Sequence, residues 1–69
     1  MKISARNVLP ATVVSIKDGA VNSEVLVKLA GGEEIVSVVT KASVDHLGLA
    51  AGKQVYVVVK ASNVMLAVD

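Results

Sequence analysis

Two short clusters of the sequence combine hydroxyl side chains with a positive charge. Ser4 and Arg6 stand two residues apart, so they lie on one side of the extended segment that we expect there. Lys60 and Ser62 repeat this spacing around Ala61, where a predicted strand ends. Neither cluster contains an acidic residue. Both clusters therefore offer positive charge and hydrogen-bond donors that suit a small anion.

Thr40 and Ser43 form a third cluster, at the start of a predicted helix. The first N–H groups of a helix lack partners within it, and the helix dipole favours negative charge at this end. Together the three clusters supply two cations, several hydroxyls and backbone N–H groups, which fit a tetrahedral oxyanion with two negative charges. Ser and Thr also cap helices, and Lys and Arg flank strands for solubility, so the residues alone leave both interpretations open.

The sequence lacks the groups that catalysis needs, namely an activated nucleophile, a base or a bound metal. It has no Cys and one His. His46 stands beside Asp45 near the end of the predicted helix, where a histidine usually interacts with solvent and the helix dipole. Gly31 and Gly32 are not followed by a helix, so they do not form a phosphate-binding loop. We therefore expect no enzyme activity, no directly coordinated metal cation and no organic cofactor.

Apolar alternation and turn residues divide the chain into strands and one short helix. We expect five strands, over residues 11–17, 21–29, 34–39, 55–60 and 63–68. A helix of about two turns lies between Thr40 as N-cap and Gly48 at its end. Pro10 lacks an N–H, so the first strand begins after it or carries an edge or a bulge there. The order β-β-β-α-β-β predicts an all-β fold with one short helix, an OB-like five-stranded Greek-key barrel, formed by a single domain over residues 1–69. A generic small sandwich is the alternative.

A chain of 69 residues needs help beyond its own small core. Chains of this length usually rely on disulfides, a structural metal or oligomerisation, and the lack of Cys with a single His leaves oligomerisation. The predicted strands also carry apolar residues on both faces. In the fourth strand Val57 points one way, while Tyr56 and Val58 point the other. Exposed apolar area of this kind marks an interface, so we expect a homo-oligomer.

The charge pattern excludes several classes of partner. The chain carries 7 basic and 6 acidic residues, spread without a run of either sign, and one aromatic residue, Tyr56. Nucleic-acid binding needs a clustered basic face, and single strands also need aromatic side chains for stacking. No run approaches the roughly 20 apolar residues of a membrane helix, and the N-terminus does not look like a secretory signal. We expect a cytoplasmic domain that binds neither nucleic acid nor membranes.

Ser4 to Asn7, read as Ser-Ala-Arg-Asn, and Val59 to Met65, read as Val-Lys-Ala-Ser-Asn-Val-Met, form a specific pair of motifs. With them the chain resembles the molbindins, small molybdate-binding proteins whose domain also occurs in molybdate-responsive regulators and transporter ATPases. The resemblance covers essentially the full length, including residues 19–23, 39–44 and 47–53. It implies an OB-like barrel, a homohexamer built as a trimer of dimers, and molybdate or tungstate held as intact oxyanions at subunit interfaces.

Carried over by position, the resemblance implies one oxyanion site made of Ser4, Arg6, Thr40, Ser43, Lys60, Ala61 (through its N–H) and Ser62. It implies a second site near a threefold axis, for which Asn22 and Ser23 are the candidates. Because no DNA-binding segment or ATPase module is present, we expect intracellular storage and molybdenum homeostasis, without catalysis. The alternatives are an OB-fold nucleic-acid-binding module and a purely structural oligomerisation domain, in which Ser4, Arg6, Lys60 and Ser62 form an interface network.

Overall fold

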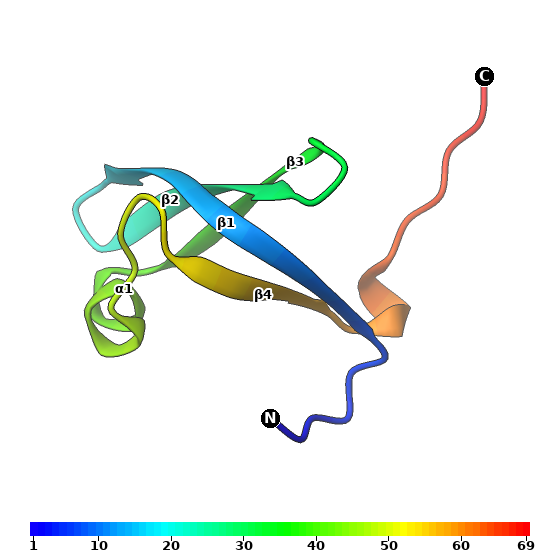
Figure 1. Cartoon of the computed structure of the whole chain (residues 1–69), viewed down its shortest axis with the longest axis horizontal. Coiled ribbons are helices and arrows are strands. Elements are labelled where there is room, and N and C mark those ends of the chain that lie inside the picture. Colours follow the sequence, from blue (N-terminus) through cyan, green and yellow to red (C-terminus); the bar gives the residue numbers. More distant parts are fainter.

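The computed structural model describes residues 1–69 and contains four strands, one α-helix and one 3₁₀ turn (Figure 1). Their bounds are β1 Asn7–Asp18, β2 Asn22–Leu29, β3 Glu34–Thr40, α1 Lys41–Leu47, β4 Gln54–Val59 and η1 Ala61–Asn63. All neighbours in the sheet are antiparallel, in the order β3-β2-β1-β4. Three consecutive strands with a fourth that returns beside the first make a Greek key, and the sheet curls into a half-barrel.

The core lies inside this curl and is small. Only 5 of the 69 residues are buried, namely Ala11, Val13, Ser23, Val25 and Val27. All five come from β1 and β2, the two central strands, and Val13 and Val27 are direct cross-strand partners. β-branched valines fit such a pleated, half-buried surface well. The chain therefore folds around one hairpin, and its outer strands are covered on one side at most.

The predicted helix is confirmed, together with both of its caps. The Thr40 hydroxyl accepts a hydrogen bond from the Ser43 N–H (3.0 Å), which satisfies one of the free donors at the start of α1. Gly48 ends the helix in the left-handed region (φ 61°), and its N–H donates to the Asp45 carbonyl. Val44 packs against the core, so α1 covers one end of the half-barrel. No helix of the structure is long and apolar enough to cross a membrane.

The first strand begins earlier than predicted, at Asn7, and it includes Pro10. Residues 7–10 pair with β4 alone, because the pairing of β1 with β2 starts at Ala11. Val13 donates its N–H to the Lys53 carbonyl, and hydrogen-bonded positions alternate along an antiparallel pair, so Pro10 falls at a non-hydrogen-bonded position toward β4. The missing N–H thus faces a side where β1 has no neighbour, as proline in a strand requires.

The predicted fifth strand over residues 63–68 is wrong for this chain. After η1, residues 64–69 run away from the sheet and pair with nothing (Figure 1). Met65, Leu66 and Val68 are 93–97% exposed. Alternation of apolar residues predicts a strand, but a strand also needs a neighbour for its backbone N–H and C=O groups. The observed order is therefore β-β-β-α-β.

The two edge strands expose apolar side chains on their outer faces, as the two-faced strands predict. Val36 and Val38 on β3 are 56% and 65% exposed, and Tyr56 and Val58 on β4 are 60% and 40% exposed. The alternate residues of both strands are half-buried on the inner face. Both edge strands thus present valine to solvent in the single chain.

Candidate anion site

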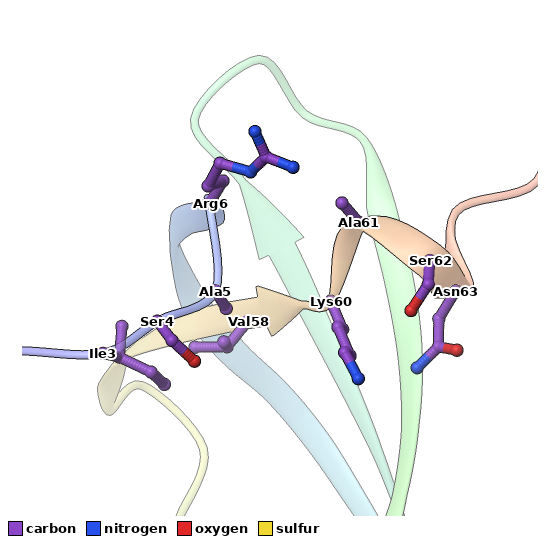
Figure 2. A pocket seen from close by; sticks show the side chains of 9 residues that line it. All are labelled: Ile3, Ser4, Ala5, Arg6, Val58, Lys60, Ala61, Ser62 and Asn63. Atoms are coloured by element: carbon purple, nitrogen blue, oxygen red, sulfur yellow. The ribbon is translucent and has the colours of Figure 1, made fainter.

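A depression of about 590 Å³ lies at the end of the sheet where β1 begins and β4 ends (Figure 2). Its lining consists of Ile3, Ser4, Ala5, Arg6, Val58, Lys60, Ala61, Ser62 and Asn63. Five of the seven residues predicted for the first oxyanion site are among them. The structure thus brings together the two end clusters of the sequence, Ser4 with Arg6 and Lys60 with Ala61 and Ser62.

Strand pairing explains this meeting of the two ends of the chain. β1 and β4 are antiparallel neighbours, and their last pair is Asn7 with Val59. Arg6 directly precedes this pair and Lys60 directly follows it. The cations therefore come from segments more than 50 residues apart that leave the sheet at the same point.

The segment before β1 is not fully extended, so the side chains of Ser4 and Arg6 do not share one side. The chain bends at Ser4 and at Arg6, and Figure 2 shows the Ser4 hydroxyl and the Arg6 guanidinium on opposite sides of the view. The expectation that both lie on one side of an extended segment is wrong for this chain. Lys60 and Ser62 do point to a common side, because η1 turns the chain there, with the Asn63 N–H bonded to the Lys60 carbonyl at 2.8 Å.

The pocket is rich in donors and contains no acidic residue. Lys60 and Arg6 bring positive charge, and the backbone N–H groups of Ala61 and Ser62 find no acceptor within the chain. These are the first N–H groups of a 3₁₀ turn, which normally lack an internal partner. Nowhere in the chain do three His, Asp or Glu side chains gather as ligands for a metal ion. The arrangement suits an anion.

Asn63 also lines the pocket, although it was not among the predicted ligands. Its side-chain amide lies on the same side as Lys60 and Ser62 (Figure 2). The extended strand predicted from residue 63 would have carried this amide away from Lys60. The three-residue turn of η1 instead returns it to the pocket, and nothing in the residue pattern signalled that turn.

Thr40 and Ser43 lie at the other end of the molecule. Thr40 pairs with Asn22, the first residue of β2, next to the end of β1, whereas Arg6 and Lys60 adjoin its beginning. Figure 1 shows α1 and η1 at opposite ends of the sheet. One chain thus does not bring the predicted seven-residue set together.

The hydroxyls of Thr40 and Ser43 are bonded to each other. Thr40 Oγ1 donates to Ser43 Oγ at 2.9 Å and accepts from the Ser43 N–H. The Thr40 hydroxyl is therefore used in capping α1, while the Ser43 hydroxyl proton stays free to donate outward. The pair can therefore serve both predicted functions, with Thr40 as the helix cap and Ser43 as a donor to an anion.

Asn22 and Ser23 lie beside a second, shallower depression. Ser23 is buried, and its hydroxyl donates to Asp18 Oδ1 at 2.7 Å. The carboxylates of Asp18 and Glu24 line the same depression, and carboxylates repel an oxyanion. Within a single chain this geometry disfavours the second site, which stays a prediction.

Comparison with known proteins places the chain in a family. Residues 3–66 match the TOBE domain. The probable molybdenum-pterin-binding protein of Haemophilus influenzae is 46% identical over 69 residues, the full length of both chains. The chain belongs to the molbindin (Mop) group of TOBE-domain proteins.

Solved molbindin structures share the fold described above. A molybdate-binding protein from Sporomusa ovata is 39% identical, with a TM-score of 0.91 over 97% of this chain and 98% of that one. The cytoplasmic molybdate-binding protein ModG, in a form with molybdate bound, is 52% identical with a TM-score of 0.95. The match covers all of this chain and 49% of ModG, so the chain corresponds to about half of that protein.

Proposed function

We propose that this molbindin binds molybdate or tungstate as an intact oxyanion, without catalysis. The observation that carries the proposal is the donor-rich pocket without acidic residues, whose lining includes Arg6, Lys60, Ser62 and Ser4. Relatives with the same fold are described as molybdate-binding proteins, which supports the choice of anion. The ligand is a bound oxyanion rather than a coordinated cation, and no organic cofactor takes part.

The site is completed by a second copy of the chain. On the single chain the depression of about 590 Å³ is open to solvent and larger than one four-oxygen anion. Thr40 and Ser43, the remaining members of the predicted site, lie at the opposite end of the same chain. Donors from a neighbouring subunit would both narrow the pocket and exclude water, which strengthens charge-assisted hydrogen bonds.

The exposed tail, residues 64–69, supports self-association. An apolar groove of about 150 Å³ opens on the inner face between the two edge strands, with Val39 of β3 and Val57 of β4 among its lining. A tail from a second copy would supply the missing fifth strand and close an OB-like barrel, because Leu66 and Val68 alternate as a strand requires. We propose the homohexamer, a trimer of dimers, as the assembled form.

Selectivity arises from the spacing of fixed donors. Molybdate and tungstate are somewhat larger than sulfate, and an anion that does not reach a buried donor leaves it unpaired at about 1–3 kcal/mol. Phosphate is partly protonated at neutral pH, and the pocket has no carboxylate to accept that proton. The function in the cell is storage of the anion in the cytoplasm, as part of molybdenum homeostasis.

Isothermal titration of the protein with molybdate, tungstate, sulfate and phosphate tests this function, with the mass of the same sample measured by light scattering. Arg6→Ala and Lys60→Ala should each weaken molybdate binding by about 10- to 150-fold, the equivalent of one charge-assisted hydrogen bond. Lys28→Ala is the matched control, because Lys28 is an exposed lysine on β2 outside the pocket.

Three results would contradict the proposal. A hexamer that binds none of the anions would indicate a structural oligomerisation domain. Sulfate bound as tightly as molybdate would remove the selectivity. Salt-sensitive binding of a single-stranded oligonucleotide, measured on the same sample, would favour a nucleic-acid-binding module.

A further inference from the structure

One side-chain hydrogen bond joins the two segments that form the pocket. Asn7 Nδ2 donates to the Val59 carbonyl at 3.1 Å, across 52 residues of sequence, and the bond is partly buried. Asn7 is the first residue of β1 and follows Arg6, and Val59 is the last residue of β4 and precedes Lys60. The bond therefore sits at the end of the β1–β4 ladder, between the sheet and the pocket.

We infer that Asn7 is a positioning residue for the oxyanion pocket, an inference that rests on the proposed function. Beyond Asn7 and Val59 no backbone hydrogen bond joins residues 1–6 to residues 60–69. The relative placement of Arg6 and Lys60 thus depends on the last ladder position. Terminal ladder positions open most easily, and an additional side-chain bond there opposes that opening.

The same bond also orients the peptide that leads into η1. In a trans peptide the C=O and N–H groups point in opposite directions, so fixing the Val59 carbonyl fixes the direction of the Lys60 N–H. The next two carbonyls are engaged as well, since Lys60 and Ala61 accept bonds from the N–H groups of Asn63 and Val64. The carbonyl oxygens of Val59, Lys60 and Ala61 thus all accept hydrogen bonds within the chain. The backbone N–H groups of Ala61 and Ser62 remain free to donate to an anion.

A matched control exists at the other end of the same strand pair. Gln54 Nε2 donates to Thr12 Oγ1 at 3.0 Å, and Thr12 and Gln54 are cross-strand partners. Both bonds tie β1 to β4 through a side-chain amide. Only the Asn7 bond adjoins the pocket. A general loosening of the β1–β4 pair would therefore affect variants of Asn7 and Gln54 alike, whereas a loss of positioning would affect the Asn7 variants alone.

The experiment measures molybdate affinity by isothermal titration and thermal unfolding for the full chain and three variants. Asn7→Ala should weaken molybdate binding about three- to tenfold, the effect of losing one neutral hydrogen bond, while Gln54→Ala changes affinity less than twofold. Asn7→Asp keeps the shape of the side chain, removes the donor and adds a negative charge. Asn7→Asp should weaken molybdate binding more than Asn7→Ala does at low salt, and the affinities of the two variants should become similar at high salt. If Asn7→Ala does not fold, Asn7→Asp at high salt takes its place, since the added charge is screened there and the same three- to tenfold loss is expected.

A double-mutant cycle with Lys60→Ala separates positioning from simple destabilisation. If Asn7 acts through the placement of Lys60, the effect of Asn7→Ala shrinks in the Lys60→Ala background. Full additivity, an unchanged affinity in both Asn7 variants, or an equal loss in Gln54→Ala would each overturn the positioning function while the proposed function stands. Absence of molybdate binding in the unmodified protein would overturn both.

Discussion

Ser23 is the only buried polar residue, and its environment is well defined at the scale of single atoms. It is 1% exposed, lies on the inner face of β2 and donates its hydroxyl proton to Asp18 across the first hairpin. A buried hydroxyl without a partner would cost free energy, so this bond explains why a serine can stand in a valine-rich core. The residue is thus first of all a structural link between the ends of β1 and β2.

Ser23→Ala tests that interpretation. Loss of the bond should lower the free energy of unfolding by about 1.5–3 kcal/mol, measured by urea unfolding, because the acceptor is a carboxylate. The number of molybdate ions bound per subunit should not change. Ser15→Ala, at an exposed serine of β1, is the control and should alter neither quantity. A lower number of bound ions in Ser23→Ala would instead favour the predicted second site with Asn22.

At the scale of elements, the tail of residues 64–69 is the segment without a structural partner. Its residues alternate as in a strand, with Val64, Leu66 and Val68 on one side and Met65 on the other. Both edges of the sheet, β3 and β4, are open. Unpaired edges pair readily with other chains, which is the basis of the proposed pairing between the tail of one copy and the sheet of another.

Leu66→Asp should therefore dissociate the oligomer, as measured by sedimentation or light scattering at several protein concentrations. A charge buried in the groove of the neighbouring chain would be strongly unfavourable. Met65→Asp is the matched control, because Met65 would face the opposite side of the added strand and should affect the mass much less. Equal dissociation by both variants would contradict the strand geometry, and an unchanged mass in Leu66→Asp would exclude the tail from the interface.

At the scale of the whole molecule, the single chain is less compact than its length allows. Its radius of gyration is 12.7 Å, against about 11 Å expected for a globular domain of this size. Five buried residues are a small core, and large hydrophobic side chains remain exposed on the outer face and the tail. If the proposed oligomer forms, it would bury part of this surface, and its stability would depend on protein concentration and on any ligand bound between subunits.

Molybdate should raise the unfolding temperature, and so should a higher protein concentration. At a free molybdate concentration of 100 times Kd, one site adds about 2.7 kcal/mol to the free energy of unfolding. Differential scanning calorimetry over a range of protein and molybdate concentrations measures both effects, with equal sulfate as the control for ionic strength. An unfolding temperature independent of protein concentration would contradict an obligate oligomer.

Local features of this fold were readable from the sequence because their causes are local. The Thr40 cap and the left-handed Gly48 depend on residues close to them in the sequence. The same holds for the inner faces of the strands, where alternation by itself places Val25 and Val27 in the core.

The sequence by itself determined four strands, the helix, their apolar faces and the donor chemistry of the two end clusters. Only the tertiary structure decided which donors meet, because the pairing of β1 with β4 is a contact between distant segments that local patterns do not encode. It brought Arg6 and Lys60 to the same depression, separated Thr40 from both, and left the tail unpaired. A strand pattern specifies which face is apolar, whereas its neighbour is chosen by the whole sheet, and for the tail that neighbour is absent from the single chain.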